Sequence, residues 1–179
     1  MSDRLTAVRI SRRSVAWGAG IFVVLAVVGV LCGLLWRSRL DIPHGVVVSH
    51  QWFPDPWDGG ERASFAATGW YVVVALGAGV VLGVLAASLS RAQELVTLAA
   101  VLVGSVVGTW LMLRVGLHGA PPDPQLAAAH AADGTRLSGT ISRPGAAALV
   151  TWPLAAVAVV GGIFLLVPGR RTDRSEIEE

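Results

Sequence analysis

Two apolar stretches, AATGWYVVVALGAGVVLGVLAAS (66–88) and LVTLAAVLVGSVVGTWLMLRVGL (95–117), decide how this chain folds. Each has 23 residues. At about 1.5 Å per helical residue, each is long enough to cross a hydrocarbon core of roughly 30 Å. A short polar link (89–94) joins them. We therefore predict a hairpin of two membrane-spanning helices at the packing centre of a bundle.

Small side chains recur at helical spacing in these spans. In the first span they occur at every fourth residue. The second span holds two glycines with the same spacing, and so does an earlier apolar run. These residues are Ala75, Gly79, Gly83 and Ala87, then Gly104 and Gly108, then Gly29 and Gly33. In lipid, small residues on one helix face let two backbones approach closely. We predict that they form the helix contacts of the bundle.

The composition of the whole chain is that of a membrane protein. Of its 179 residues, 54% are hydrophobic and 15% are charged, and the mean hydropathy is +0.64. Soluble domains carry about 25% charged residues. Two further apolar runs, 14–36 and 146–168, bring the number of spans to four. The predicted fold class is an all-α membrane protein, a single membrane domain built as a bundle of four transmembrane helices.

The ends of the outer spans need separate interpretation. The basic segment 1–13 before the first span raises the possibility of a cleaved signal. That span is too long for a signal core and no small-x-small site follows it, so we predict an uncleaved helix. Trp17 and Trp36 stand near its ends, where interfacial aromatics are expected. Pro153, near the start of the last span, either kinks that helix or sits in its first turns.

Two long connections, 37–65 and 118–145, are predicted to form a small extracytoplasmic cap. In the first, β-branched and aromatic residues from Gly45 to Phe53 predict a strand, and residues 54–60 have turn chemistry. In the second, Asp123 followed by Pro124 predicts the start of a short helix that runs toward Ala132. Residues 136–141 predict a second strand, and pairing it with the first would make a short β-hairpin.

The distribution of arginine predicts the orientation, because the chain has no lysine. Four spans put both termini on one side. With that side in the cytoplasm, the N-terminal segment, the link 89–94 and the tail 169–179 hold eight arginines in 30 residues, against five in the 57 residues of the two connections. The positive-inside rule therefore predicts a plasma-membrane protein with both termini cytoplasmic.

The sequence contains no motif for catalysis or for a cofactor. All four histidines lie in the two connections, and His44 and His50 are the candidates for a metal site. Their spacing matches no ligand motif, so solvated loop residues are the favoured interpretation. Arg114 lies about one turn from the end of its span, and we predict that it snorkels to the headgroups rather than pairing with a buried acid.

Aromatic residues of the first connection suggest a contact surface on the outer side. Trp52, Phe53 and Trp57 are candidates for binding a partner, because surface aromatics often mark contact sites. Anchoring at the membrane interface explains the same residues equally well. The chain has one cysteine, Cys32, so neither a disulfide nor a cysteine zinc site can form within one chain. Cys32 lies inside an apolar run.

Several short motifs carry a family resemblance. They are Ser64-Phe65-Ala66-Ala67 at the start of the second span, Pro122-Asp123-Pro124 in the second connection and Trp152-Pro153 in the last span. With the basic N-terminus and the proline-containing first loop, they resemble the small four-pass membrane proteins of unknown function found in actinobacteria. The resemblance implies a membrane protein without an assigned activity and supplies no catalytic residue.

The leading hypothesis is a non-enzymatic accessory or scaffold subunit of a cell-envelope or membrane complex. Its partners would be membrane lipids and either another protein or further copies of itself. Nucleic acid is excluded as a partner because the chain has no basic cluster. The alternative is a transporter or channel component formed by oligomerisation, although spans without Asp, Glu, His or Lys disfavour ion-coupled transport. An enzyme using the outer His and Asp residues is the least favoured class.

Overall fold

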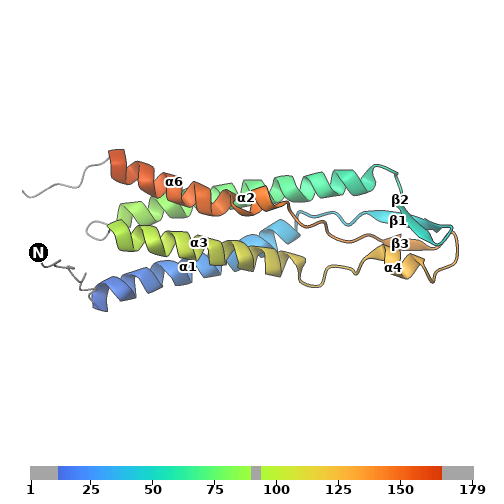
Figure 1. The fold of residues 1–179 in the computed structure, drawn as a ribbon, viewed down its shortest axis with the longest axis horizontal. Helices are drawn as coiled ribbons and strands as arrows, with labels where there is room; N and C mark the ends of the chain where they lie inside the picture. The colour runs from blue at the N-terminus through green and yellow to red at the C-terminus, as the bar shows by residue number, and fades with distance from the viewer. Residues whose placement is uncertain (1–11, 90–93, 167–179) are drawn as a thin grey trace, which may run out of the picture.

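The computed structural model describes residues 12–89 and 94–166. In chain order its elements are α1 (Arg12–Arg37), β1 (His44–Val48), β2 (Gln51–Pro54), α2 (Gly59–Leu89), α3 (Glu94–Leu117), α4 (Pro124–Ala128), β3 (Arg136–Ser138), α5 (Ala146–Leu149) and α6 (Thr151–Leu166). Figure 1 shows the long helices side by side, with the strands and α4 beyond one end of the bundle. We call the strands, α4 and the segments joining them the cap.

The prediction of four long apolar helices is confirmed. Four helical segments are long and apolar enough to cross a membrane, and they are Val15–Arg37, Gly59–Leu89, Glu94–Leu117 and Ala146–Leu166. A three-stranded sheet adds a β element to the predicted helical bundle. Most of the predicted N-terminal segment 1–13, most of the link 89–94 and the predicted tail lie outside the described residues, and helix α1 already begins at Arg12.

Helix α2 is longer than the predicted span. It begins at Gly59 rather than Ala66, so the prediction of a turn at Gly59-Gly60 was wrong. Its 31 residues extend about 46 Å at 1.5 Å per residue, which is more than a bilayer core requires. Asp58 precedes the helix, Glu61 lies in its first turn, and Asp58 pairs with Arg62 at 2.6 Å. Acidic residues at this end favour helix initiation, which is consistent with the start of α2 at Gly59, close to the cap.

The fourth apolar segment is divided in two. Helix α5 ends at Leu149, Val150 separates the two pieces, and α6 begins at Thr151. Pro153 is therefore the third residue of α6, within its first turn. At that position the missing backbone N–H removes no bond within the helix. Of the two predicted roles for this proline, the structure shows the one in the first turn.

The strand predicted from Gly45 to Phe53 is in fact two strands. β1 pairs with β2 in antiparallel register, with Val48 opposite Gln51, and Ser49 and His50 form the two-residue turn with φ of 51° and 60°. Positive φ at both turn residues matches the right-handed twist of the flanking strands, but glycine and asparagine are the usual residues there. Because Ser49-His50 lacks that signature, the sequence pattern gave no sign of the turn.

The predicted pairing between the two connections is present. β3 lies antiparallel to β1, with Gly45 opposite Leu137, and the strand order of the sheet is β2-β1-β3. The predicted cap helix is also present as α4. As predicted, Asp123 caps its start, where its side chain accepts a hydrogen bond of 3.0 Å from the backbone N–H of Gln125. Helix α4 ends at Ala128, earlier than the predicted Ala132, and β3 ends at Ser138 rather than residue 141.

Candidate functional site

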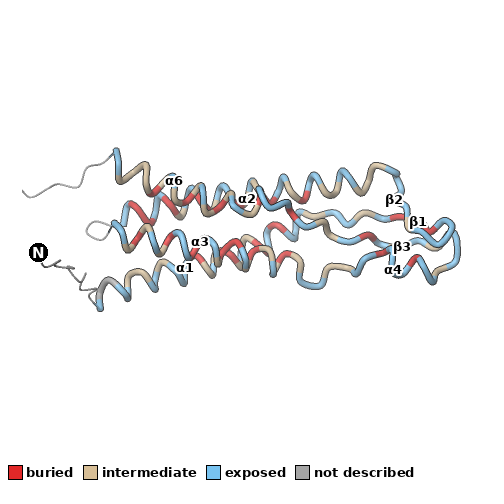
Figure 2. The backbone as a smooth tube through the Cα atoms, viewed as in Figure 1, coloured by how far each residue is buried: buried red, intermediate tan, exposed pale blue. Residues whose placement is uncertain are grey.

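The helix contacts of the bundle are made where side chains are small. A Cβ atom on Gly29 of α1 would lie 2.5 Å from the carbonyl oxygen of Gly108 in α3, and one on Gly33 would lie 2.7 Å from that of Met112. These distances leave no room for a side chain, so the α1 and α3 backbones are in direct contact. Figure 2 shows the buried residues along the inner sides of the helices and exposed residues on their outer sides.

Helices α2 and α6 pack in the same way. A Cβ atom on Gly79 would lie 2.9 Å from the carbonyl oxygen of Trp152, and one on Gly83 would lie 3.0 Å from that of Ala156. Ala75 and Ala87 of α2 are buried. Gly104 of α3 faces Leu25 of α1. Each residue predicted from its spacing to be at a helix contact therefore lies in the interior of the bundle.

Large aromatic side chains fill the space between these helix pairs. Trp36 from α1, Tyr71 from α2 and Trp152 from α6 are fully buried. The indole N–H of Trp36 donates a 2.8 Å hydrogen bond to the Ala67 carbonyl, and its ring meets Tyr71 edge to face at 5.2 Å. The prediction that Trp36 is an interfacial anchor was wrong. Its ring instead occupies the space left by Gly116 of α3 and joins α1 to α2 near the cap.

Three buried polar atoms in this aromatic layer have no hydrogen-bond partner outside their own group among the described residues. They are the Tyr71 hydroxyl, the Thr109 hydroxyl and the indole nitrogen of Trp152. All three groups are uncharged at neutral pH. They can hydrogen-bond a polar atom, but none of them is a carboxylate or an imidazole suited to proton transfer near pH 7.

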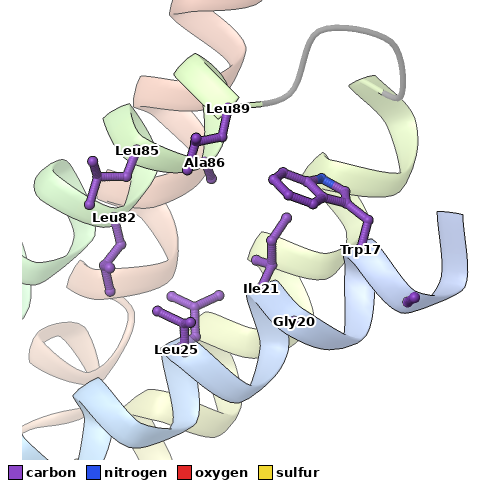
Figure 3. A pocket seen from close by; sticks show the side chains of 10 residues that line it. Trp17, Gly20, Ile21, Leu25, Leu82, Leu85, Ala86 and Leu89 are labelled. Carbon is purple, nitrogen blue, oxygen red and sulfur yellow. The ribbon is translucent and has the colours of Figure 1, made fainter. Parts of the chain in front are cut away.

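An apolar cleft separates α1 from α2 at the end of the bundle away from the cap. Its volume is about 270 Å³ and its walls carry no charged side chain. Figure 3 shows Trp17 and Ile21 of α1 pointing toward Ala86 and Leu89 of α2 across this cleft. Such a lining suits hydrocarbon and offers no group for chemistry.

The three aromatic residues predicted as a contact surface have different surroundings. Trp52 is half-buried, its indole N–H donates to the Leu137 carbonyl at 3.1 Å, and its ring lies against Gly139. The side-chain amide of Gln125 in α4 accepts from the Trp52 N–H at 3.1 Å and donates to the Trp52 carbonyl at 3.0 Å. Trp52 is therefore part of the cap's own packing.

Phe53 and Trp57, by contrast, are directed outward. The exposed fractions of their side chains are 48% and 82%. Alternation along the strands places Phe53 on the face of the sheet opposite that of buried Val47. We call this face the open sheet face, and by register it carries His44, Val46, Val48, Gln51, Phe53, Arg136 and Ser138.

The open sheet face has an apolar centre. Val46 lies directly opposite Phe53 in the register, and Val48 is 48% exposed. Helix α4 packs against β2, and its Gln125 hydrogen-bonds the outer edge of that strand. Adjacent apolar side chains exposed on a sheet face are characteristic of a surface that meets another molecule.

The histidines are spread over the cap. The Nδ1 atom of His44 lies 3.5 Å from the Ser138 hydroxyl. His50 forms part of the hairpin turn, where its backbone N–H donates a hydrogen bond to the Asp133 carboxylate. In residues 12–89 and 94–166, no group of three His, Cys, Asp or Glu side chains is arranged to hold a metal ion. Cys32 is a free, half-buried thiol.

Positive charge collects where α1 and α3 end, beside the cap. Arg37, Arg114 and His118 line a crevice of about 560 Å³ together with Leu34, Val115 and Gly119. Arg114 is exposed, with its guanidinium carbon 5.3 Å from the centre of the Trp110 ring. Sequence reasoning treated Arg114 alone and did not bring it together with Arg37.

Comparison of the chain with protein-family models, with curated proteins and with solved structures finds no match. The resemblance to four-pass actinobacterial proteins therefore stays a prediction from short motifs. The function has to be argued from the residues and surfaces described above.

Proposed function

We propose that the chain is a multi-pass plasma-membrane protein with four transmembrane helices, both termini in the cytoplasm and the cap outside the cell. Two observations support this proposal. The start of α1, the end of α6 and the ends of α2 and α3 that the link joins all lie at the end of the bundle away from the cap (Figure 1). The sequence segments that adjoin these helix ends have the higher density of arginine.

The orientation predicts which side of the membrane a probe reaches. In a Cys32→Ser background, a cysteine at Ser49 in the cap turn should react on intact cells with a membrane-impermeant maleimide. A cysteine at Ser88, an exposed residue near the opposite end of α2, should react only after the cells are opened. Labelling of Ser88→Cys but not of Ser49→Cys on intact cells would show that the orientation is the opposite of the one proposed.

Within this membrane, we propose that the protein is a non-enzymatic accessory or scaffold subunit of a cell-envelope complex. The observation that carries the proposal is the open sheet face, with Val48 and Phe53 exposed, Val46 half-buried beside them and Trp57 exposed in the following turn. A sheet face of this kind, together with an exposed tryptophan, can provide the aromatic and aliphatic anchors of a protein interface. The close helix packing and the well-filled aromatic core would hold this surface in a fixed position.

The test is the recovery of a partner protein in mild detergent. We expect the wild-type chain to co-purify with a distinct membrane or envelope protein in a defined ratio. The double variant Phe53→Ser, Trp57→Ser should reduce that recovery by about tenfold or more, because losing a single hot-spot aromatic of about 2 kcal/mol already weakens binding more than tenfold. Leu126→Ser is the matched control, since Leu126 is an apolar cap residue, 73% exposed, on α4.

Two outcomes would contradict the accessory role. One is equal loss of the partner in Leu126→Ser and in the double variant, because the open sheet face would then have no special part. The other is a homo-oligomer without a further protein that conducts ions when reconstituted in liposomes. That result would favour the alternative, a channel component formed by oligomerisation.

A further inference from the structure

We propose that the crevice between the ends of α1 and α3 binds the phosphate of an anionic phospholipid headgroup. This inference rests on the proposed membrane location but not on the protein partner or on the orientation. The crevice contains Arg37 in the last turn of α1, Arg114 in the last turn of α3, and His118 just after α3.

The backbone after α3 brings these groups together. Gly119 has a φ of +69°, a conformation that favours glycine, in the turn that follows α3. A Cβ atom at Gly119 would lie 3.6 Å from Nη2 of Arg37, so the guanidinium of α1 reaches the turn that follows α3. The Arg114 guanidinium lies over the ring of Trp110, with its central carbon 5.3 Å from the ring centre. Two guanidinium groups from different helices therefore border one space.

No acidic side chain of the described residues forms an ion pair with Arg37 or Arg114. None of the residues lining the crevice is acidic, and the ion pair found in residues 12–89 and 94–166 joins Arg62 to Asp58 at the start of α2. A cation in the last turn is favoured by the dipole of its own helix. That effect explains one arginine on each helix, but it does not explain why both arginines line the same crevice. An anion between them would offset their repulsion, and the planar guanidinium suits the oxygens of a phosphate.

The shape of the crevice favours a lipid over free phosphate. Beneath the charged rim, Leu34 and Val115 form an apolar wall, and Leu34 is 52% exposed on the outer side of α1. A glycerophospholipid presents both parts, a phosphodiester for the rim and acyl chains for the wall. The two arginines end helices of membrane-spanning length, which is the level at which headgroups lie.

The experiment measures lipid retention by the isolated full-length protein. The protein is reconstituted in vesicles of phosphatidylcholine and phosphatidylglycerol, extracted in mild detergent and analysed by native mass spectrometry. We expect the wild type to retain phosphatidylglycerol in preference to phosphatidylcholine by about 25-fold, since each of the two arginines contributes about fivefold near a membrane surface and the two factors multiply. The double variant Arg37→Gln, Arg114→Gln should abolish this preference.

Matched variants separate the crevice from total charge. Arg136→Gln, Arg143→Gln removes the same charge from exposed cap residues and should leave the preference unchanged. Arg37→Lys, Arg114→Lys should retain part of it, because the charge stays while the bidentate geometry is lost. All three variants alter exposed side chains, and unchanged unfolding temperatures would verify that each one folds.

Three results would overturn the proposal. The first is a wild type without preference for the anionic lipid. The second is equal loss in the crevice variant and in the Arg136→Gln, Arg143→Gln control, which would indicate a general charge effect. The third is full displacement of the lipid by excess inorganic phosphate, which would identify a phosphate site without a role for the acyl chains. Vesicles carry the anionic lipid in both leaflets, so an inverted topology does not alter the readout.

Discussion

Replacing Gly29 by alanine should lower the free energy of unfolding by about 1–3 kcal/mol, the range expected for overpacking a close contact. The new Cβ atom would lie 2.5 Å from the carbonyl oxygen and 2.7 Å from the Cα of Gly108. Both are backbone atoms, which cannot rotate away as the end of a flexible side chain can. The helices α1 and α3 must then separate, and the contacts along their shared face weaken.

The matched control for this prediction lies on the same helix. A Cβ atom on Gly20 would meet nothing within 4 Å, so Gly20→Ala should be neutral or stabilising by up to about 1 kcal/mol, the difference in helix propensity. Thermal unfolding of the purified protein in detergent, followed by tryptophan fluorescence, compares the two variants directly. Equal stability of Gly29→Ala and Gly20→Ala would mean that α1 and α3 are not in backbone contact.

The helix contacts could be predicted from the sequence because one periodicity controls them. Four residues make slightly more than one helical turn, so Gly79 and Gly83 share a face, and in an apolar helix a face of small residues is suited to packing. The pattern identifies the packing face but not the partner. That α1 packs on α3 and α2 on α6 depends on how bulky residues such as Trp152 fill the interior, which spacing alone does not encode.

The parts that could not be predicted depend on local geometry or on tertiary contact. The hairpin turn at Ser49-His50 uses positive φ without glycine or asparagine, so its residues carry no recognisable signal. The crevice unites Arg37 and Arg114, which are 77 positions apart in the sequence, and only the packing of α1 against α3 brings them together. The helical start of α2 did leave a signal, Asp58 followed three residues later by Glu61, but the adjacent glycines suggested a turn.

Trp36→Ala is expected to be as disruptive as the glycine substitution, or more so, for a different reason. The change empties the space beside Gly116, removes the 2.8 Å hydrogen bond to the Ala67 carbonyl and leaves Tyr71 without its edge-to-face neighbour. Large-to-small substitution of a fully buried aromatic lowers stability by about 3–5 kcal/mol. In a bilayer the transfer term is smaller, because lipid is also apolar, and lost packing supplies most of the effect.

Two further variants separate a buried role from an interfacial one. Trp36→Phe keeps a ring but loses the indole N–H, so it should be intermediate, about 1 kcal/mol below the wild type for the lost hydrogen bond plus a smaller packing loss. Trp57→Ala should leave the isolated protein's stability unchanged, because that side chain is 82% exposed. Thermal unfolding in detergent ranks the three. If Trp36→Ala unfolds at the wild-type temperature, then Trp36 faces the membrane interface, α1 and α2 are not joined near the cap, and the aromatic layer does not hold the bundle together.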